Sequence, residues 1–578
     1  MSRFLRVVFI ACILVITGYT LVQLKIPDGD GTISFFTQRP SDSCRPLSIT
    51  TPYQPNTNGH FNWRDVTTKH PVSTLRQLSS KKGTRLSKVQ HDFLTPQPTV
   101  VEQRKHRQQE VKTAFQRCWQ AYKEKAWLKD ELKPITNSFK DNFGGFGATL
   151  VDNLDTLHIM NMDAEFEETV VAAVGIDFNP EKSSLDEINI FETIIRHLGG
   201  FLGTYELTEC KDTRLLDKAV ELGDMIYKAF DTPNRMPITH WNLRKAAQGE
   251  PQVAPDDGLL AELASSFMEL TRLSQLTGDM RWFDATQRIA DMLDEQQNQT
   301  TLPGMWPAKV NARASDVRVG RRYSVGGESD STYEYLVKMC ALLGSGDIME
   351  QYRRMYDSSM DAALRHVLFR PLVPDNADIL MPGSVTANGP GEISLDPKAE
   401  HLACVFGGML ALGGRLFQND TQLEIGRKVT QGCIWAYKNS PLGIMADSVQ
   451  MIKCNSAADC EWQNERSGWY SASPDPTYRL RPEAIESVFY LYRITGDEAY
   501  QDIAWDMFQA VNQATQTESA NAMLSNVMSG VASKQDSMES FWMSETLKYF
   551  YLIFSETEYL SLDTFVFNTE AHPFRRNR

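Results

Sequence analysis

The sequence predicts an all-α protein whose helical hairpins close into a barrel. From about Val111 onward, helical apolar periodicity runs to a short Gly/Asp turn and then resumes with an aromatic residue and a second amphipathic segment. The clearest hairpins span 270–293, turning at 277–279, and 488–511, turning at 495–497. Their spacing is too irregular for a stacked solenoid. Because many inner segments are apolar on most sides yet carry acids, we favour a barrel whose inner helices line a polar cavity.

The amino-terminal residues predict a membrane anchor. Arg3 and Arg6 precede an uncharged apolar run from Val7 to Leu24, which is long enough to cross a bilayer. No convincing small-x-small cleavage site follows this run. We therefore interpret residues 1–24 as a cytoplasmic tip and an uncleaved signal anchor, with the rest of the chain translocated. A cleaved signal peptide is the alternative.

Residues 25–110 predict a lumenal stem or linker, because this stretch is basic and rich in Pro, Thr and Ser. The net charge of −14 divides into +8 for residues 1–110 and −22 for residues 111–578, the predicted barrel domain. So acidic a domain argues against a nucleic-acid partner. It suits a neutral or cation-assisted ligand.

Nine cysteines in a lumenal chain predict a few disulfides and at least one unpaired thiol. Cys454 and Cys460 bracket a short polar loop that a disulfide would close. The sequence has no Cys-x-x-Cys pair, which weakens zinc and redox interpretations. Glycosylation sequons beginning at Asn298 and Asn419 agree with a lumenal location.

Four segments set acids among apolar and aromatic residues. In the clearest one, Pro482 suits the first turn of a helix, so Glu483 and Glu486 open that helix on one face near its positive dipole end. A lone acid of this kind usually lies on the wet side of an amphipathic helix. Four such segments together indicate a shared cavity. The acids of the other three are Glu192, Asp330 with Glu334, and Glu539 with Glu545.

Acids converging on one cavity without a Cys/His cluster indicate glycoside chemistry. One carboxyl would protonate the leaving oxygen while another activates water. Aromatic side chains would stack on sugar faces, although core packing is the commoner role of any single aromatic. Calcium binding is a second hypothesis, because hard oxygen ligands are abundant.

Seven ordered motifs carry a resemblance to a known family. They resemble the class I α-1,2-mannosidases of glycoside hydrolase family 47, in a fungal style, from about Val111 to the C-terminus. The resemblance implies an (α/α)7 barrel and an inverting, calcium-dependent exo-hydrolase that trims α-1,2-linked mannose from N-glycans. The motifs begin at Gly144-Gly-Phe-Gly, Phe191-Glu-Thr-Ile, Asp330-Ser-Thr-Tyr-Glu, His401-Leu-Ala-Cys, Leu480-Arg-Pro-Glu, Met538-Glu-Ser-Phe-Trp and Phe567-Asn-Thr-Glu.

The resemblance assigns catalytic and metal-binding roles. Glu483 matches the general base, and Glu192 matches the acid that protonates the leaving oxygen through a water; Asp330 is the alternative proton donor. Thr569 matches the calcium ligand, through its hydroxyl and its carbonyl. The remaining ligands would be substrate hydroxyls and waters held by four acids, namely Glu334, Glu486, Glu539 and Glu570.

Further residues match positions around the same pocket and are expected to bind substrate. For the charged ones, ion pairing within the barrel is the alternative. Cys404 and Cys433 match the family's principal disulfide. The expected substrate-binding residues are Asp152, Arg196, Glu269, Arg481, Phe541 and Asp447.

Two positions depart from the family pattern. Asp447 ends Gly443-Ile-Met-Ala-Asp, where the family usually has Gly-Leu-x-Pro-Glu. We expect this shortened carboxylate to loosen the substrate subsite. Glu328 stands where endoplasmic reticulum members often carry the Arg that helps choose a glycan branch. Branch preference is therefore not carried over.

We predict an active hydrolase that acts on high-mannose N-glycans of glycoproteins. It would be a single-pass type II protein of the endoplasmic reticulum or Golgi membrane with a lumenal catalytic domain. A second hypothesis is a low-turnover, lectin-like quality-control factor of the same fold. The pair Cys404 and Cys433 favours the hydrolase, because that branch tends to lack it. A third hypothesis, a structural solenoid, leaves the embedded acids unexplained.

Overall fold

The structure, a computed structural model, describes residues 44, 52–56, 59–78, 86–389, 391–455, 460–462 and 468–577. These residues belong to one unit, Ser41–Arg578. The anchor predicted for residues 1–24 lies outside the described residues. Among the helices that are described, none has the length and apolar character that a bilayer crossing requires.

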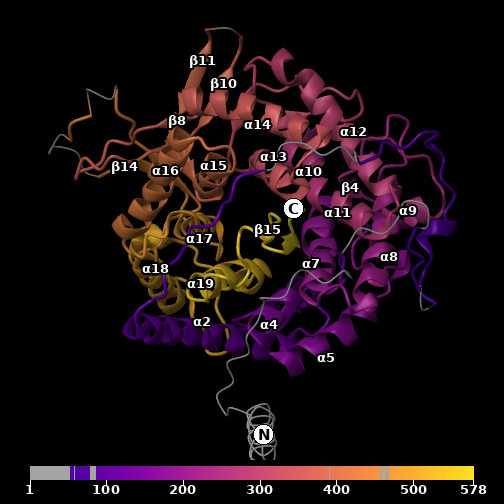
Figure 1. The fold of residues 1–578 in the computed structure, drawn as a ribbon, viewed down its shortest axis with the longest axis horizontal. Helices are drawn as coiled ribbons and strands as arrows, with labels where there is room; N and C mark the ends of the chain where they lie inside the picture. The colour runs from indigo at the N-terminus through magenta and orange to yellow at the C-terminus, as the bar shows by residue number, and fades with distance from the viewer. Residues whose placement is uncertain are drawn as a thin grey trace, which may run out of the picture. The chain divides into compact units, whose positions relative to one another are not determined.

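Helix pairs form a closed ring in this part of the chain (Figure 1). Each inner helix contacts the next from α4 round to α19, and η8, which leads into α19, contacts α4 and closes the ring. Helix α19 at the end of the ring pairs with α2 at its beginning. Seven pairs of one inner and one outer helix are described, which confirms the (α/α)7 barrel. They are α4 (Leu154–Ile159) with α5 (Asp163–Val174), α7 (Gly199–Leu207) with α8 (Thr213–Ala229), α11 (Phe267–Thr277) with α12 (Arg281–Gln296), α13 (Asp330–Leu343) with α14 (Asp347–His366), α15 (Val405–Leu416) with α16 (Asp420–Asn439), α17 (Glu483–Thr495) with α18 (Ala499–Thr515), and α19 (Leu547–Ile553) with α2 (Pro98–Lys125).

Burial separates the inner helices from the outer ones. In α13 every residue from Ser331 to Leu343 is buried. Its partner α14 buries one stripe at helical spacing, which includes Met349, Tyr352 and Tyr356. The predicted hairpin turns are confirmed: α11 and α17 end before Gly278 (φ 76°) and Gly496 (φ 74°), whose left-handed conformation glycine tolerates best.

Shorter helical segments connect these pairs. Two of them are π-helices, η4 (Thr193–Leu198) and η8 (Trp542–Thr546), and η8 leads directly into α19. The others are η2 (Trp63–Asp65), α3 (Ala148–Asp152), η3 (Pro180–Lys182), α6 (Ile190–Glu192), α9 (Leu243–Ala247), α10 (Leu260–Ala264), η5 (Gln297–Gln299), η6 (Leu402–Cys404) and η7 (Val527–Ser529).

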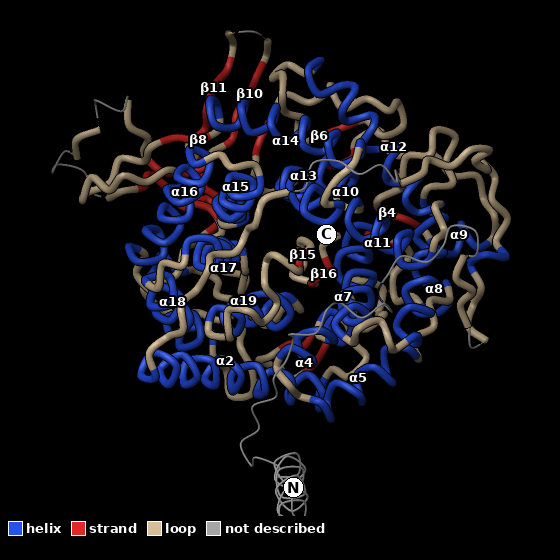
Figure 2. Tube along the Cα trace, in the orientation of Figure 1, coloured by secondary structure: helices blue, strands red, loops and turns tan. Residues whose placement is uncertain are grey.

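The strands are short and pair antiparallel (Figure 2). One hairpin, β15 (Phe565–Phe567) with β16 (Pro573–Arg575), lies inside the ring and contacts α13 and α7. The other sheets are β1 (Glu131–Lys133) with β2 (Ser138–Lys140), β3 (Ile188–Asn189) with β4 (His240–Trp241), β5 (Gly258–Leu259) with β6 (Lys309–Val310), β8 (Leu368–Phe369) with β9 (Met381–Pro382), the order β11 (Ile393–Asp396), β10 (Ser384–Ala387), β7 (Arg322–Ser324), and the order β12 (Lys398–Glu400), β13 (Ser448–Met451), β14 (Tyr470–Asp475).

The structure differs from the linker predicted for residues 25–110. The described residues 52–56, 59–78 and 86–97, here called the strap, pack against the barrel, with Trp63 1% and Val89 0% exposed. The first two stretches contact outer helices such as α8, and residues 86–97 contact the end of α17 and residues 557–563. Helix α2 then begins at Pro98 and crosses the predicted boundary at residue 110. We therefore assign the described part of the stem to the folded domain.

Carboxylates of the outer helices hold the strap. Asp217 of α8 accepts a hydrogen bond from the Tyr53 hydroxyl at 2.6 Å. Asp231, just after α8, accepts from the backbone N–H groups of Lys69 at 2.6 Å and His70 at 2.7 Å. Such contacts satisfy the polar backbone of an extended segment. Neither composition nor hydrophobic periodicity predicts them, because the strap has no repeating apolar pattern.

Three disulfides occur among the described residues. Cys404–Cys433 and Cys454–Cys460 were both anticipated from the sequence. The third, Cys44–Cys210, joins the chain before the strap to the end of α7. Two described cysteines, Cys118 and Cys340, are buried thiols.

Candidate active site

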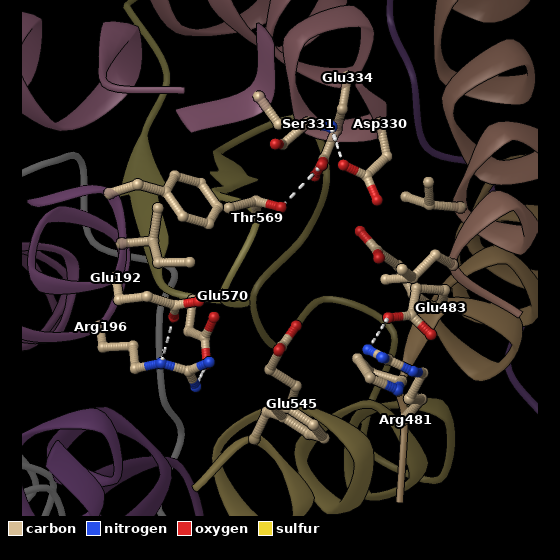
Figure 3. Close-up of a pocket in the computed structure, with 18 of the residues that line it drawn as sticks. Glu192, Arg196, Asp330, Ser331, Glu334, Arg481, Glu483, Glu545, Thr569 and Glu570 are labelled. Carbon is tan, nitrogen blue, oxygen red and sulfur yellow. Dashed lines mark hydrogen bonds and ion pairs between the residues drawn. The ribbon is translucent and has the colours of Figure 1, made fainter. Parts of the chain in front are cut away.

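A cavity of about 290 Å³ opens among the inner helices and the β15–β16 hairpin. Its described lining includes the aromatic rings of Phe191 and Phe541. In Figure 3 carboxyl groups from opposite sides point into the same space. The nine lining acids are Glu192, Glu262, Glu328, Asp330, Glu334, Glu483, Glu486, Glu545 and Glu570.

Helix beginnings and helix irregularities bring these acids together. Asp330 and Glu483 are the first residues of α13 and α17, where the helix dipole favours negative charge. Arg196 and Glu545 lie in the two π-helices, a form often found at functional sites. Thr569 lies in the turn between β15 and β16.

Glu483 is held in its ionised form. Its Oε2 lies 2.6 Å from Nδ1 of His401, and its Oε1 lies 3.7 Å from Nη1 of Arg481. Burial acts to raise the pKa of Glu483, but the hydrogen bond and charge of His401, with the charge of Arg481, hold that pKa below its ordinary value. An ionised carboxylate beside the cavity has the protonation state of a general base.

Asp330, in contrast to Glu483, is held in its protonated form. Burial raises its pKa to about 8, and the charges of Glu334 and Glu483 add to this increase. The backbone N–H of Ser331 donates to its carboxyl at 2.9 Å, which only partly offsets the effect. Asp330 is therefore protonated at neutral pH and has a proton to give. Two carboxyls with pKa values pushed apart are typical of an acid and base pair.

Arg196 organises the side of the cavity where Glu192 lies. Its Nε donates to Glu192 at 2.8 Å, its Nη1 donates to the Ser540 hydroxyl at 2.9 Å, and it also pairs with Glu570. The guanidinium lies 5.5 Å from the ring centroid of Phe541. Glu192, Arg196 and Phe541 thus share one wall, as the resemblance implied.

Asp152 and Glu269, expected to bind substrate, lie behind the lining. Asp152 is fully buried and accepts a hydrogen bond from Ser544 at 2.8 Å, with Nη1 of Arg196 at 3.6 Å. Glu269 is also fully buried and accepts from Nδ2 of Asn568 at 2.8 Å. Asp152 therefore has the ion-pair partner that the alternative interpretation anticipated, whereas the described partners of Glu269 are the neutral groups of Asn568 and Tyr335.

Asp447 is likewise absent from the described lining. Its Oδ1 lies 3.1 Å from Nε of Arg481, and its Oδ2 pairs with Arg479. The shortened carboxylate therefore already reaches its arginine partners, because the Asp447 backbone is fixed by hydrogen bonds to His401 and Thr477. This geometry differs from the expectation of a loosened subsite.

Glu539 was expected to help hold the metal, but Glu545 of the same motif lines the cavity instead. Glu539 precedes η8 and is partly buried outside the lining. Glu545 lies within the π-helix, whose wider turn changes which side chains face inward. The sequence signal for Glu545 was its position among aromatic residues. That signal does not say whether Glu539 or Glu545 faces the cavity, because this depends on the register of the π-helix.

The floor of the cavity has the donors of a hard-cation site. The Thr569 hydroxyl donates to Oε2 of Glu334 at 2.8 Å. Oε2 of Glu545 is buried and has no hydrogen-bond partner among the described residues. Burial and neighbouring carboxylates raise the pKa values of Glu545 and Glu570 well above the ordinary range.

Lys338 supplies one positive charge to this floor, bonding to Glu486 at 3.0 Å and to Glu334. The remaining crowded carboxyls and the Thr569 oxygens form an oxygen-only donor set. Such a set fits a hard divalent cation.

An all-helical barrel whose cavity opposes a protonated and an ionised carboxyl has the construction of a glycoside hydrolase. The sequence model of glycosyl hydrolase family 47 matches residues 114–576, and the chain belongs to that family. This membership is consistent with a metal-dependent enzyme.

Relatives share most of this domain. Mannosyl-oligosaccharide alpha-1,2-mannosidase IA of Spodoptera frugiperda is 35% identical over 483 residues, which are 81% of this chain and 67% of that protein. Mannosyl-oligosaccharide 1,2-alpha-mannosidase MNS1 of Arabidopsis thaliana is 32% identical over 87% of this chain and 83% of that protein. The solved alpha-1,2-mannosidase from Trichoderma reesei matches with a TM-score of 0.73 and 28% identity, covering 84% of this chain and all of that one.

Proposed function

We propose that the chain is an inverting exo-hydrolase that removes terminal α-1,2-linked mannose from high-mannose N-glycans. The observation that carries this proposal is that Asp330 and Glu483, the first residues of two inner helices, line one cavity. Their surroundings shift their pKa values in opposite directions, upward for Asp330 and downward for Glu483. The names of the relatives supply the sugar and the linkage. They also do not favour the lectin-like alternative.

The described residues divide the reaction between them. Glu483 takes a proton from the attacking water through the oxygen that His401 leaves free. A proton reaches the leaving oxygen from Asp330, which lines the same cavity and holds one at neutral pH. Glu192 lies beside Arg196 at 2.8 Å and stays a candidate for relaying that proton through water.

We propose Ca²⁺ as the cation, held by Thr569 and by waters bound to Glu334, Glu486, Glu545 and Glu570. A bound ion would orient sugar hydroxyls and offset the charge of these acids. With such an ion bound, the proton donor would act on the glycosidic oxygen and the base on the attacking water.

We also propose that the protein is a single-pass type II protein of the endoplasmic reticulum or Golgi membrane. The apolar run Val7 to Leu24 and the three disulfides support translocation into an oxidising lumen. Protease protection of the full chain in intact microsomes tests this topology: cleavage of the catalytic domain without detergent contradicts it.

The experiment for the activity uses the compact unit Ser41–Arg578, so that the strap is kept. It is incubated with a nine-mannose glycan and calcium, and product masses are followed. Proton NMR of the first released mannose distinguishes inversion from retention. Stepwise loss of single hexoses with β-mannose as the initial anomer is expected; binding without any mass loss contradicts the proposal.

A further inference from the structure

His401 connects the base to a residue outside the cavity. The imidazole is fully buried, and each of its ring nitrogens has one described partner. Nδ1 lies 2.6 Å from Oε2 of Glu483, and Nε2 lies 2.7 Å from the hydroxyl of Tyr437. Tyr437 belongs to the outer helix α16, is 2% exposed and does not line the cavity. An outer helix thus reaches the base through a single imidazole.

The surrounding structure fixes this chain of contacts. The backbone N–H of His401 donates to the Asp447 carbonyl at 3.0 Å. The rings of Tyr437 and Tyr478 lie 5.7 Å and 5.8 Å from the imidazole, centroid to centroid. The Cys404–Cys433 disulfide joins a residue three positions after His401 to a residue one helical turn before Tyr437. The imidazole is therefore held against rotation from both sides.

We infer that Tyr437 is a positioning residue for Glu483: through His401, its hydroxyl keeps an N–H directed at the base. This inference rests on the proposed function of Glu483.

The hydroxyl suits this role because it both donates and accepts. With a neutral imidazole, the Tyr437 O–H donates to Nε2, so the ring proton lies on Nδ1 and faces Glu483. With a charged imidazole, Nε2–H donates to the Tyr437 oxygen, and Nδ1–H again faces Glu483. Burial raises the pKa of Tyr437 well above its ordinary value, so the hydroxyl keeps its proton.

Removing the Tyr437 hydroxyl has the same consequence whether the His401 imidazole is neutral or charged. A buried Nε2 without a partner weakens the Nδ1–H donation to Glu483 or destabilises the charged ring. The pKa of Glu483 then rises. The other titratable groups that face Glu483 are Arg481, Asp330 on α13, Tyr478 and Glu545 in η8, and the substitution leaves all four in place. Tyr478 also hydrogen-bonds the Tyr437 hydroxyl.

The test is Tyr437→Phe, assayed on the nine-mannose glycan after wild-type turnover has been demonstrated, so that failure of the proposed function is seen separately. We expect kcat to fall about three- to tenfold, as for loss of one hydrogen bond, with KM within twofold. The acidic limb of the kcat/KM profile should move to higher pH, because activity needs ionised Glu483. The matched control is Tyr352→Phe on α14, whose buried hydroxyl has no partner among the described residues; its profile should be that of the wild type.

A double-mutant cycle tests whether Tyr437 acts through His401. In a His401→Gln background, Tyr437→Phe should cause no further loss; an equal loss in both backgrounds overturns the inference. Should Tyr437→Phe fold poorly, 3,5-difluorotyrosine at position 437 keeps the shape and changes the acidity of the hydroxyl. A shifted acidic limb then supports the inference, and an unchanged limb in either variant overturns it.

Discussion

Replacing Trp63 by alanine tests whether the strap is part of the folded domain. Trp63 is 1% exposed in η2, its Nε1 donates to the Phe178 carbonyl at 2.9 Å, and its ring lies 5.3 Å from that of Trp241. Trp→Ala substitutions at such buried positions cost about 3–5 kcal/mol. Proteins open locally at free energies below that of global unfolding, so we expect this loss to appear first as local opening of the strap.

Native-state hydrogen exchange measures that opening directly. The backbone amides of Lys69 and His70, which donate to Asp231, are suitable reporters. A loss of about 3–5 kcal/mol corresponds to exchange roughly 150- to 5,000-fold faster at these amides, since each 1.36 kcal/mol is a factor of ten. Activity should change little, because Trp63 lies outside the cavity lining.

The matched control is Leu94→Ala, because Leu94 is also in the strap but is 90% exposed. Its exchange pattern should equal that of the wild type. If Trp63→Ala accelerates the Lys69 and His70 amides by less than tenfold, the strap does not depend on this burial and our assignment of the stem to the domain is wrong.

Four further predictions concern the cavity. Glu483→Gln should keep glycan binding, measured calorimetrically, while kcat falls about 10² to 10⁴-fold, because an amide cannot accept the proton; near-normal turnover contradicts its role. Chelation should abolish turnover and lower Tm, with both restored by calcium, and Thr569→Ala should weaken calcium binding in titration calorimetry; equal affinity removes Thr569 from the ligand set. Asp447→Glu should lower kcat/KM severalfold, because the longer side chain displaces Arg481 from its 3.1 Å contact; a gain supports the loosened subsite instead. The kcat/KM profile should fall as pH rises through about 8, where Asp330 loses its proton. On the acidic side, activity should persist to a pH below the ordinary pKa of a glutamate, because Glu483 stays ionised there. A flat profile across pH 8 removes Asp330 as the proton source.

The sequence predicted those parts of the fold that repeat. Apolar spacing gave the helix pairs and glycine gave their turns, because both follow from local backbone physics. The strap was missed because its order comes from single carboxylates on distant helices, such as Asp217 and Asp231, that accept hydrogen bonds from an aperiodic segment.

Within the site, residue type was predicted better than residue position. Acids among aromatics identified Glu192, Asp330 and Glu483, all of which line the cavity. Glu539 was expected at the cavity, but Glu545 lines it, because the π-helix η8 changes which side chains face inward. Amino-acid composition does not reveal such a shift. Asp152 matched a pocket position, but only the tertiary structure shows that it lies behind Arg196.

Because α2 and α19 lie at opposite ends of the barrel sequence, the ring can close only late in synthesis. Helix α2 ends at Lys125, but α19 begins only at Leu547. At 5–20 residues per second, the apolar face of α2, with Phe115 and Trp119, waits roughly 20 to 80 s for its partner. During that time the nascent chain exposes a surface on which chains aggregate. Because α2 stays unpaired until α19 has been made, we expect newly made protein to need a chaperone at this helix.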